Sequence, residues 1–154
     1  MKKHFGCLAI ALLVGFLGLL AATSVSWDGG VHRNVHVHVT HNGQPVEGAT
    51  VMLLAHNDKW LIEHLSPEEF QEMLKAGKSL VTTDAKGNAV VSTLFGAGGG
   101  SFLFFRHGHF VVGDASVRVT HPSFSESEAS LESLLGESSF PLRKKTLKVH
   151  FAIP

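Results

Sequence analysis

The chain has 154 residues, of which 44% are hydrophobic and 17% are charged, so it is large enough for one globular domain with a hydrophobic core. Lys plus Arg and Asp plus Glu both total 13, and the formal net charge is therefore zero. This balance argues against the strongly basic surface that binding to phosphate backbones requires, and we expect no nucleic-acid partner. The single cysteine, Cys7, excludes a disulfide framework within the chain.

Residues 1–26 have the pattern of a secretory signal peptide. Two lysines near the start precede an uncharged, mostly apolar run over residues 5–22, and the small-residue sequence AATSVS closes the segment. We expect cleavage after Ser24 or Ser26, which predicts a periplasmic or extracellular protein whose domain is residues 27–154. The alternative is an uncleaved anchor, because about 18 apolar residues just span a bilayer. Contact with a membrane is then expected only through residues 5–22.

Residues 31–40 predict a half-buried strand, because side chains suited to the two faces alternate along them. The pair Asn42-Gly43 follows and favours a tight hairpin turn, since both residues tolerate positive φ. Residues 46–54 are then expected to form the return strand. The buried side of the first strand is predicted to carry Val31, Arg33, Val35, Val37 and Val39, and the other side His32, Asn34, His36, His38 and Thr40.

Further strands are expected along the rest of the chain. The last of them alternates clearly, with Leu147, Val149, Phe151 and Ile153 on its buried side. The glycine-rich run GAGGG at 96–100 lacks the Lys and Ser/Thr of a phosphate-binding loop, and we interpret it as a flexible turn between strands. The predicted strands are residues 79–83, 88–94, 101–106, 110–120 and 145–153. The predicted core includes Val37, Val51, Leu147 and Val149.

Two short helices are predicted between the strands. The first begins at Ser66, which is a good N-terminal cap before a proline and two glutamates, and ends at Gly77. The second is expected to begin at Ser125, with Glu128 completing a capping box, and to end at Gly136. Both helices are expected to pack on a β-sandwich or to cover a sheet edge.

The stretch VHVTHNGQPVEGATVMLL, followed by TTDAKGNAVVSTL, resembles the carboxypeptidase regulatory-like domain, a transthyretin-like (prealbumin-like) β-sandwich. Gly43 and Pro45 suit its first turn, Gly48 keeps the entry to the second strand small, and Asp84 with Gly87 suits a tight turn. The resemblance covers roughly two thirds of the chain after residue 26 and implies a fold more than a function. It implies a mainly β protein: an antiparallel sandwich of about seven strands with two helical inserts, preceded by a signal or anchor helix.

Members of this family commonly act as non-catalytic modules beside enzymes, transporters or surface proteins. Transthyretin-like hydroxyisourate hydrolases resemble the chain in a His-Val strand and in the GxPxxG turn, which reads GQPVEG here. Those enzymes end in a Tyr-Arg-Gly-Ser tail, whereas this sequence ends in HFAIP and contains no tyrosine. We therefore transfer no catalytic residue from them and expect that the protein is not an enzyme.

Histidines are the remaining candidates for chemistry. His36 and His38 share one face of a strand, about 6.6 Å apart along the backbone, and His107 and His109 repeat this spacing. If the two strands are neighbours, four imidazoles converge in a site suited to zinc or copper. The alternative is that the histidines are only polar residues of an exposed face, with Gly108 placing its two neighbours in a turn. No Cys, Asp or Glu completes a ligand set by spacing, so we expect no cofactor, with zinc or copper as the alternative.

Taken together, these patterns predict an exported, non-catalytic binding or structural module of the cell envelope. Its expected partner is an envelope protein or a carbohydrate, although Trp27 and Trp60 alone do not define the aromatic platform typical of carbohydrate binding. The alternative function is a histidine-based zinc or copper binding protein.

Overall fold

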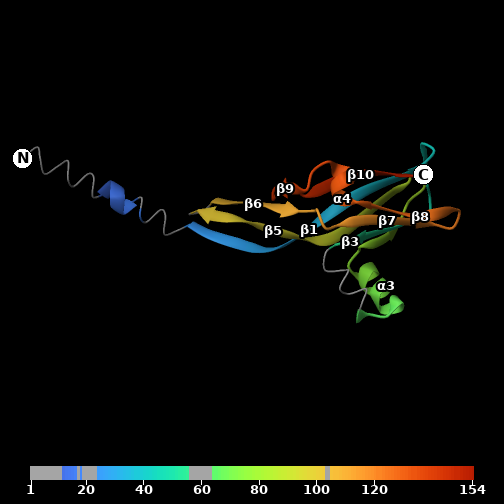
Figure 1. The fold of residues 1–154 in the computed structure, drawn as a ribbon, viewed down its shortest axis with the longest axis horizontal. Helices are drawn as coiled ribbons and strands as arrows, with labels where there is room; N and C mark the ends of the chain where they lie inside the picture. The colour runs from blue at the N-terminus through green and yellow to red at the C-terminus, as the bar shows by residue number, and fades with distance from the viewer. Residues whose placement is uncertain (1–11, 17, 19–23, 56–63, 103–104) are drawn as a thin grey trace, which may run out of the picture.

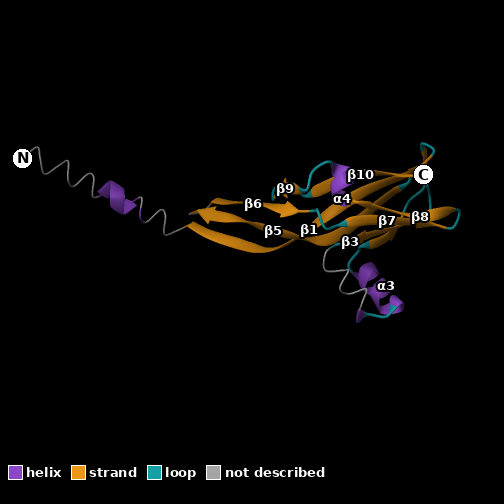
Figure 2. Cartoon of the chain, viewed as in Figure 1, coloured by secondary structure: helices purple, strands orange, loops and turns teal. Residues whose placement is uncertain are grey.

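The computed structural model describes residues 12–16, 18, 24–55, 64–102 and 105–154. These residues form a mainly β fold in which two sheets pack face to face, with two short helices outside them, as the sequence predicts (Figures 1 and 2). Seven of the described strands have five or more residues, and three are shorter. The predicted β-sandwich is therefore confirmed.

The larger sheet has the order β10-β1-β5-β6-β9, with β2 paired to the end of β1. Its pairs are antiparallel except for β1 with β10, which run parallel. The smaller sheet has the order β4-β3-β7-β8 and is antiparallel throughout. The strands of the large sheet are β1 (Ser24–His41), β2 (Gln44–Pro45), β5 (Asn88–Phe102), β6 (Phe105–Val111), β9 (Ser139–Pro141) and β10 (Thr146–Ile153). Those of the small sheet are β3 (Thr50–Leu54), β4 (Leu80–Thr82), β7 (Ser116–His121) and β8 (Phe124–Ser130).

The hydrophobic core lies between the two sheets and follows the predicted alternation. Every second residue of β10, and of β1 from Val35 to Val39, is buried there, and the predicted core residues are at most 5% exposed. Because successive side chains of a strand point to opposite faces, the intervening residues form the outer face of the large sheet. The innermost residues include Val35, Val37, Val39, Val51, Leu53, Phe110, Phe140, Leu147 and Val149.

The prediction that residues 46–54 return alongside residues 31–40 as one hairpin is wrong. Asn42 and Gly43 do form the tight turn, with φ of 50° and 76°, but only the two residues of β2 pair back onto β1. Gly48, with φ of 76°, then redirects the chain, and β3 joins the small sheet instead. Residues 110–120 are likewise divided, because a turn after Val112 carries the chain from β6 in one sheet to β7 in the other.

The glycine-rich run at 96–100 is not a turn, as we expected, but part of the 15-residue strand β5. Together with the first part of β1 and with β6, it forms an arm that extends beyond the small sheet (Figure 1). A Cβ on Gly99 would meet the backbone of β6, and one on Gly108 would lie 2.8 Å from Cζ2 of Trp27. Glycine is needed because the strands and the indole ring approach each other too closely for any side chain.

The hairpin at the end of this arm corrects a further strand prediction. Residues 101–106 belong to two strands, since β5 ends and β6 begins among them, and residues 103–104 lie outside the described part.

The first predicted helix is confirmed as α3 (Pro67–Ala76). Ser66 accepts a hydrogen bond from the backbone N–H of Glu69, whose carboxylate accepts one from the N–H of Ser66, and Gly77 ends the helix. Phe70 and Leu74 bury the inner side of α3 against Leu54 in a separate small cluster. Figure 1 shows the helix standing outside the small sheet.

The second helix, α4 (Leu131–Leu135), ends at Gly136 as predicted but begins later than expected. Ser125 and Glu128 lie in strand β8, and Ser130 is the N-terminal cap. The later start of the helix follows from strand pairing, because β8 stays paired with β7 as far as Ser130, the residue before the helix. Towards the N-terminus, residues 12–16 are helical, while most of the predicted signal segment lies outside the described residues. Among the described residues, no helix has the length and hydrophobicity to span a membrane.

Candidate functional site

The outer face of the large sheet brings together the polar and apolar side chains that point away from the core. We use this name for the outward residues of three neighbouring strands, β10, β1 and β5, whose register fixes which of them lie side by side. The residues of the outer face are His32, His36, His38, Asn88, Val90, Leu94, Lys148 and His150.

His38 and His150 are directly opposite each other on the parallel strands β1 and β10. Their rings are stacked, with centroids 5.5 Å apart and planes inclined by 25°. Alternation along each strand predicts that both histidines point outward, but it does not indicate that they are neighbours. A parallel pairing between the first and last strands leaves no local signal in the sequence.

Hydrogen bonds hold both rings of this pair. Nδ1 of His38 is 3.0 Å from the side-chain oxygen Oδ1 of Asn88, and Nε2 of His150 is 2.9 Å from the hydroxyl of Thr40. Thr40 was expected to point outward, yet it is only 5% exposed, so its hydroxyl is a fixed partner. The oxygen of Asn88 only accepts hydrogen bonds, and therefore Nδ1 of His38 donates and Nε2 has the free lone pair.

The turn before β5 fixes Asn88 in place. Oδ1 of Asp84 accepts hydrogen bonds from the backbone N–H groups of Lys86 and Asn88, at 2.9 and 2.8 Å. The backbone bond from Asn88 holds the pKa of the Asp84 carboxyl below its ordinary value. Gly87, at φ of 72°, completes the turn against the backbone of Val39, where a side chain would collide.

A shallow groove of about 250 Å3 runs along the outer face beside the histidine pair. Its lining combines His36, His38, Asn88, Val90 and Lys148. His36 is opposite Val90 on one side and opposite Lys148 on the other. The groove therefore offers hydrogen-bonding imidazoles and one ammonium group next to a half-exposed valine.

His107 and His109 do not join this group. They lie on β6, opposite Gly100 and Gly98, and β5 separates them from β1. Gly98 is eight residues along β5 from Val90, which is the partner of His36, so the two histidine pairs are about 26 Å apart. The four imidazoles cannot share one ion.

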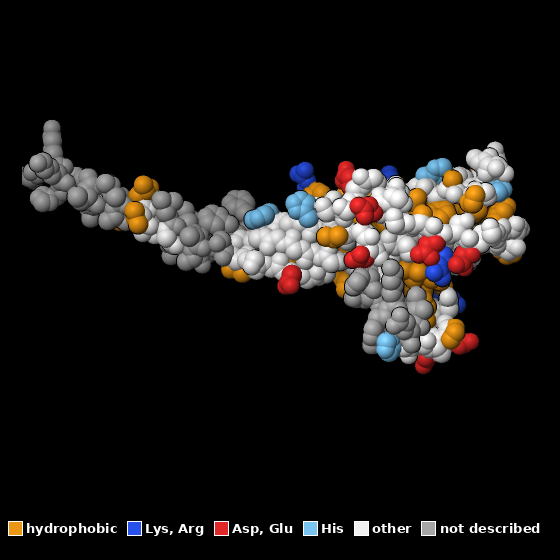
Figure 3. Space-filling model, in the orientation of Figure 1, with side chains coloured by type: hydrophobic (Ala, Val, Ile, Leu, Met, Phe, Trp, Pro, Cys, Tyr) orange, Lys and Arg blue, Asp and Glu red, His pale blue; other side chains and the backbone are white. Residues whose placement is uncertain are grey.

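The expected turn at Gly108 is also wrong, because this residue continues strand β6. His107 and His109 are both exposed, and the ring of His107 lies over Gly100. In Figure 3 the visible histidines are separated: some lie on the arm, some near the end of the sandwich that carries the C-terminus, and another on the side where α3 stands. Within the described ranges, no three His, Cys, Asp or Glu side chains are grouped as a metal site would require.

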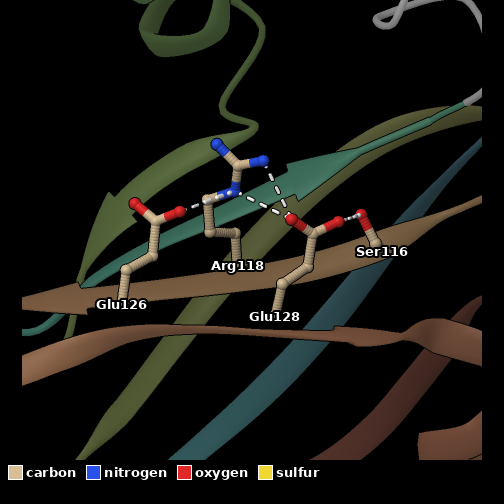
Figure 4. Close-up of polar contacts among 4 residues, drawn as sticks. All are labelled: Ser116, Arg118, Glu126 and Glu128. Carbon is tan, nitrogen blue, oxygen red and sulfur yellow. Dashed lines mark hydrogen bonds and ion pairs between the residues drawn. The ribbon is translucent and has the colours of Figure 1, made fainter.

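The small sheet carries a polar cluster of a different kind (Figure 4). Arg118 donates two hydrogen bonds to one oxygen of Glu128, at 2.9 and 3.0 Å, while Ser116 donates to the other oxygen at 2.6 Å. Glu126 lies 3.5 Å from the same guanidinium. Arg118 and Glu128 are cross-strand partners on β7 and β8, so these contacts stabilise the sheet and need no ligand to explain them.

Comparisons with known proteins add no assignment. No protein-family model matches the sequence, and no curated protein matches it either.

Proposed function

We propose that the protein is an exported, non-catalytic binding or structural module of the cell envelope that binds its partner through the outer face of the large sheet. The observation that carries this proposal is the exposure of Val90 and Leu94, each 46% exposed, on the same side of β5. They lie opposite His36 and His32, respectively. A mixture of exposed apolar and polar side chains is the composition that non-obligate protein interfaces have.

The resemblance to the carboxypeptidase regulatory-like domain supports a role in binding. Three glycines of the stretches that carry it, Gly43, Gly48 and Gly87, have φ between 72° and 76°. The backbone therefore favours glycine at these positions. At Gly48 the reason is the positive φ and not the lack of space that we expected, because a Cβ there would meet no atom within 4 Å. Non-catalytic modules are common in that family, whereas fold alone assigns no activity. We propose no enzymatic function.

The sequence of the N-terminal segment supports export. Leu12, Leu13, Val14 and Phe16 are 59–66% exposed on the short helix at residues 12–16. Such a helix needs either removal or an apolar environment. A periplasmic or extracellular location follows from cleavage after Ser24 or Ser26, and anchoring by residues 5–22 is the alternative. The proposed partner is an envelope protein or a carbohydrate, and Trp60, a candidate contact for the latter, lies outside the described residues.

Loss of the complex is the test of this proposal. In native gels of mildly solubilised envelopes, the wild-type chain should migrate in a species larger than the free protein. Val90→Lys with Leu94→Lys should convert it to the free form, because two ammonium groups replace the apolar contacts. The matched control is Glu126→Lys on the outer side of β8 in the small sheet, which should leave the complex intact. Equal migration of wild type and the double variant would show that this face binds nothing.

A histidine-based zinc or copper protein is the second candidate function. The observation that favours it is the contact between His38 and His150, at 5.5 Å between ring centroids. This pair differs from the four histidines that the sequence indicated.

A further inference from the structure

We infer that His38 and His150 form a two-imidazole site for a divalent transition-metal ion, with copper(II) bound most tightly. This inference rests on the second candidate function and names its site. It does not depend on the outer face binding a partner. Nothing in the spacing of residues along the sequence assigns these two histidines to one another.

The separation of the two rings fits coordination of one ion. An imidazole nitrogen lies about 2.0–2.1 Å from a bound zinc ion, and the ring centre is about 1.1 Å further away. Two imidazoles at a roughly tetrahedral angle therefore have centres about 5 Å apart. The observed 5.5 Å is close to this value, and the strands already place the two histidines opposite each other. Because the rings are stacked at 25°, they must tilt so that their in-plane lone pairs meet at one ion.

The hydrogen bonds occupy one nitrogen of each ring. Asn88 accepts from Nδ1 of His38 and so leaves the lone pair on Nε2. When Nε2 of His150 donates to Thr40, the lone pair of that ring is on Nδ1. Metal-binding histidines typically donate their second N–H in this way, which orients the ring and makes it a better ligand. Asn88 and Thr40 therefore hold the two rings close to each other before an ion binds.

Copper(II) is the ion that we expect to bind this pair most tightly. Lys148 lies two residues from His150 on the same face, and its positive charge opposes binding of any cation. Imidazole binds both zinc and copper, but copper(II) forms the more stable complexes along the divalent series. Two imidazoles leave the remaining positions of the ion to water, so we expect an open, exchangeable site.

The test is titration of the full chain, purified without an affinity tag, with CuCl2 alone. Calorimetry should give one site per chain of higher affinity than the remaining sites, and electron paramagnetic resonance at one equivalent should show two nitrogen ligands. His38→Asn and His150→Asn should each weaken this binding at least tenfold. The matched control is His32→Asn, since His32 is an exposed histidine of the same face that lies opposite Leu94.

Thermal unfolding of the metal-free variants checks that they fold. Neither histidine is a core residue, so we expect their melting temperatures to remain close to that of the wild type. A variant that fails this check is replaced by the corresponding glutamine.

Two results would overturn the inference. The first is a wild-type chain without a distinct high-affinity site for copper. The second is loss of binding in His36→Asn but not in His150→Asn, which would assign the ion to two histidines of the same strand. In either case the native-gel test of Val90 and Leu94 stands independently, because it measures a partner and not a metal.

Discussion

At the scale of single residues, position on one or the other face of a strand decides what a substitution costs. Val149 is 5% exposed in the core, whereas its neighbour Lys148 points outward. Val149 and Lys148 are adjacent in β10, so the same substitution can be compared at a buried and at an exposed position. The sequence alone predicts this difference, because polar and hydrophobic residues alternate from Thr146 to Phe151.

Val149→Asp should unfold the domain or lower its melting temperature severely. An unpaired carboxylate buried between the sheets costs several kcal/mol, which is comparable to the total stability of a domain of this size. Lys148→Asp on the same strand should have only a small effect. Thermal denaturation followed by circular dichroism compares the two, and similar melting temperatures would contradict the assigned faces.

Asp84 should make part of the stability dependent on pH. Its pKa is lowered in the folded protein by the backbone hydrogen bond from Asn88, so the stabilisation is present above the pKa of the unfolded chain. It is lost as pH falls through the lower, folded value. Melting temperatures measured between about pH 6 and pH 2 should therefore fall more steeply for the wild type than for Asp84→Ala. Parallel profiles would show that this carboxylate contributes nothing to the turn.

At the scale of elements, local signals predict three of the four ends of α3 and α4 but predict strand pairing poorly. Ser66, Gly77 and Gly136 act at the positions that capping preferences predict. The glycines of β5 were misinterpreted because glycine runs usually indicate turns. Here Gly99 lies against the backbone of β6, and Gly108 on β6 lies against the Trp27 ring, whereas a Cβ on Gly96 would meet no atom within 4 Å. Contacts between segments that are far apart in the sequence cannot be predicted until the order of the strands is known.

Gly108→Val should disrupt the arm while leaving the sandwich folded. Its Cβ would collide with the backbone of Gly98 and with the ring of Trp27, whereas a Cβ on Gly96 meets no atom within 4 Å. Gly96→Val is therefore the control. Hydrogen exchange should accelerate in β6 and the end of β5 for the first variant only. Unchanged exchange in Gly108→Val would contradict the close packing of the arm.

At the scale of the whole molecule, the candidate site depends on contacts between the two ends of the domain. Alternation predicts that His36, His38 and His150 are solvent-facing, and this much is available from the sequence. The order of the strands is not, since β1 has β10 on one side and β5 on the other. That order separates His107 and His109 from the pair on β1 and brings His150 to His38.

Export is the property of the entire chain that we expect to be simplest to measure. The intact mass of the protein recovered from its native cells should correspond to a chain beginning at Val25 or Trp27. Full-length protein confined to the membrane fraction would instead indicate an anchor.

The central claim is that the outer face of the large sheet contacts a partner, and photo-crosslinking in the native cells tests it most directly. A diazirine side chain replaces Leu94 in one variant and Glu126, on the small sheet, in the other. We predict a discrete adduct, of protein or carbohydrate, from position 94 and none from position 126. Absence of an adduct at 94, or the same adduct at both positions, would contradict the claim.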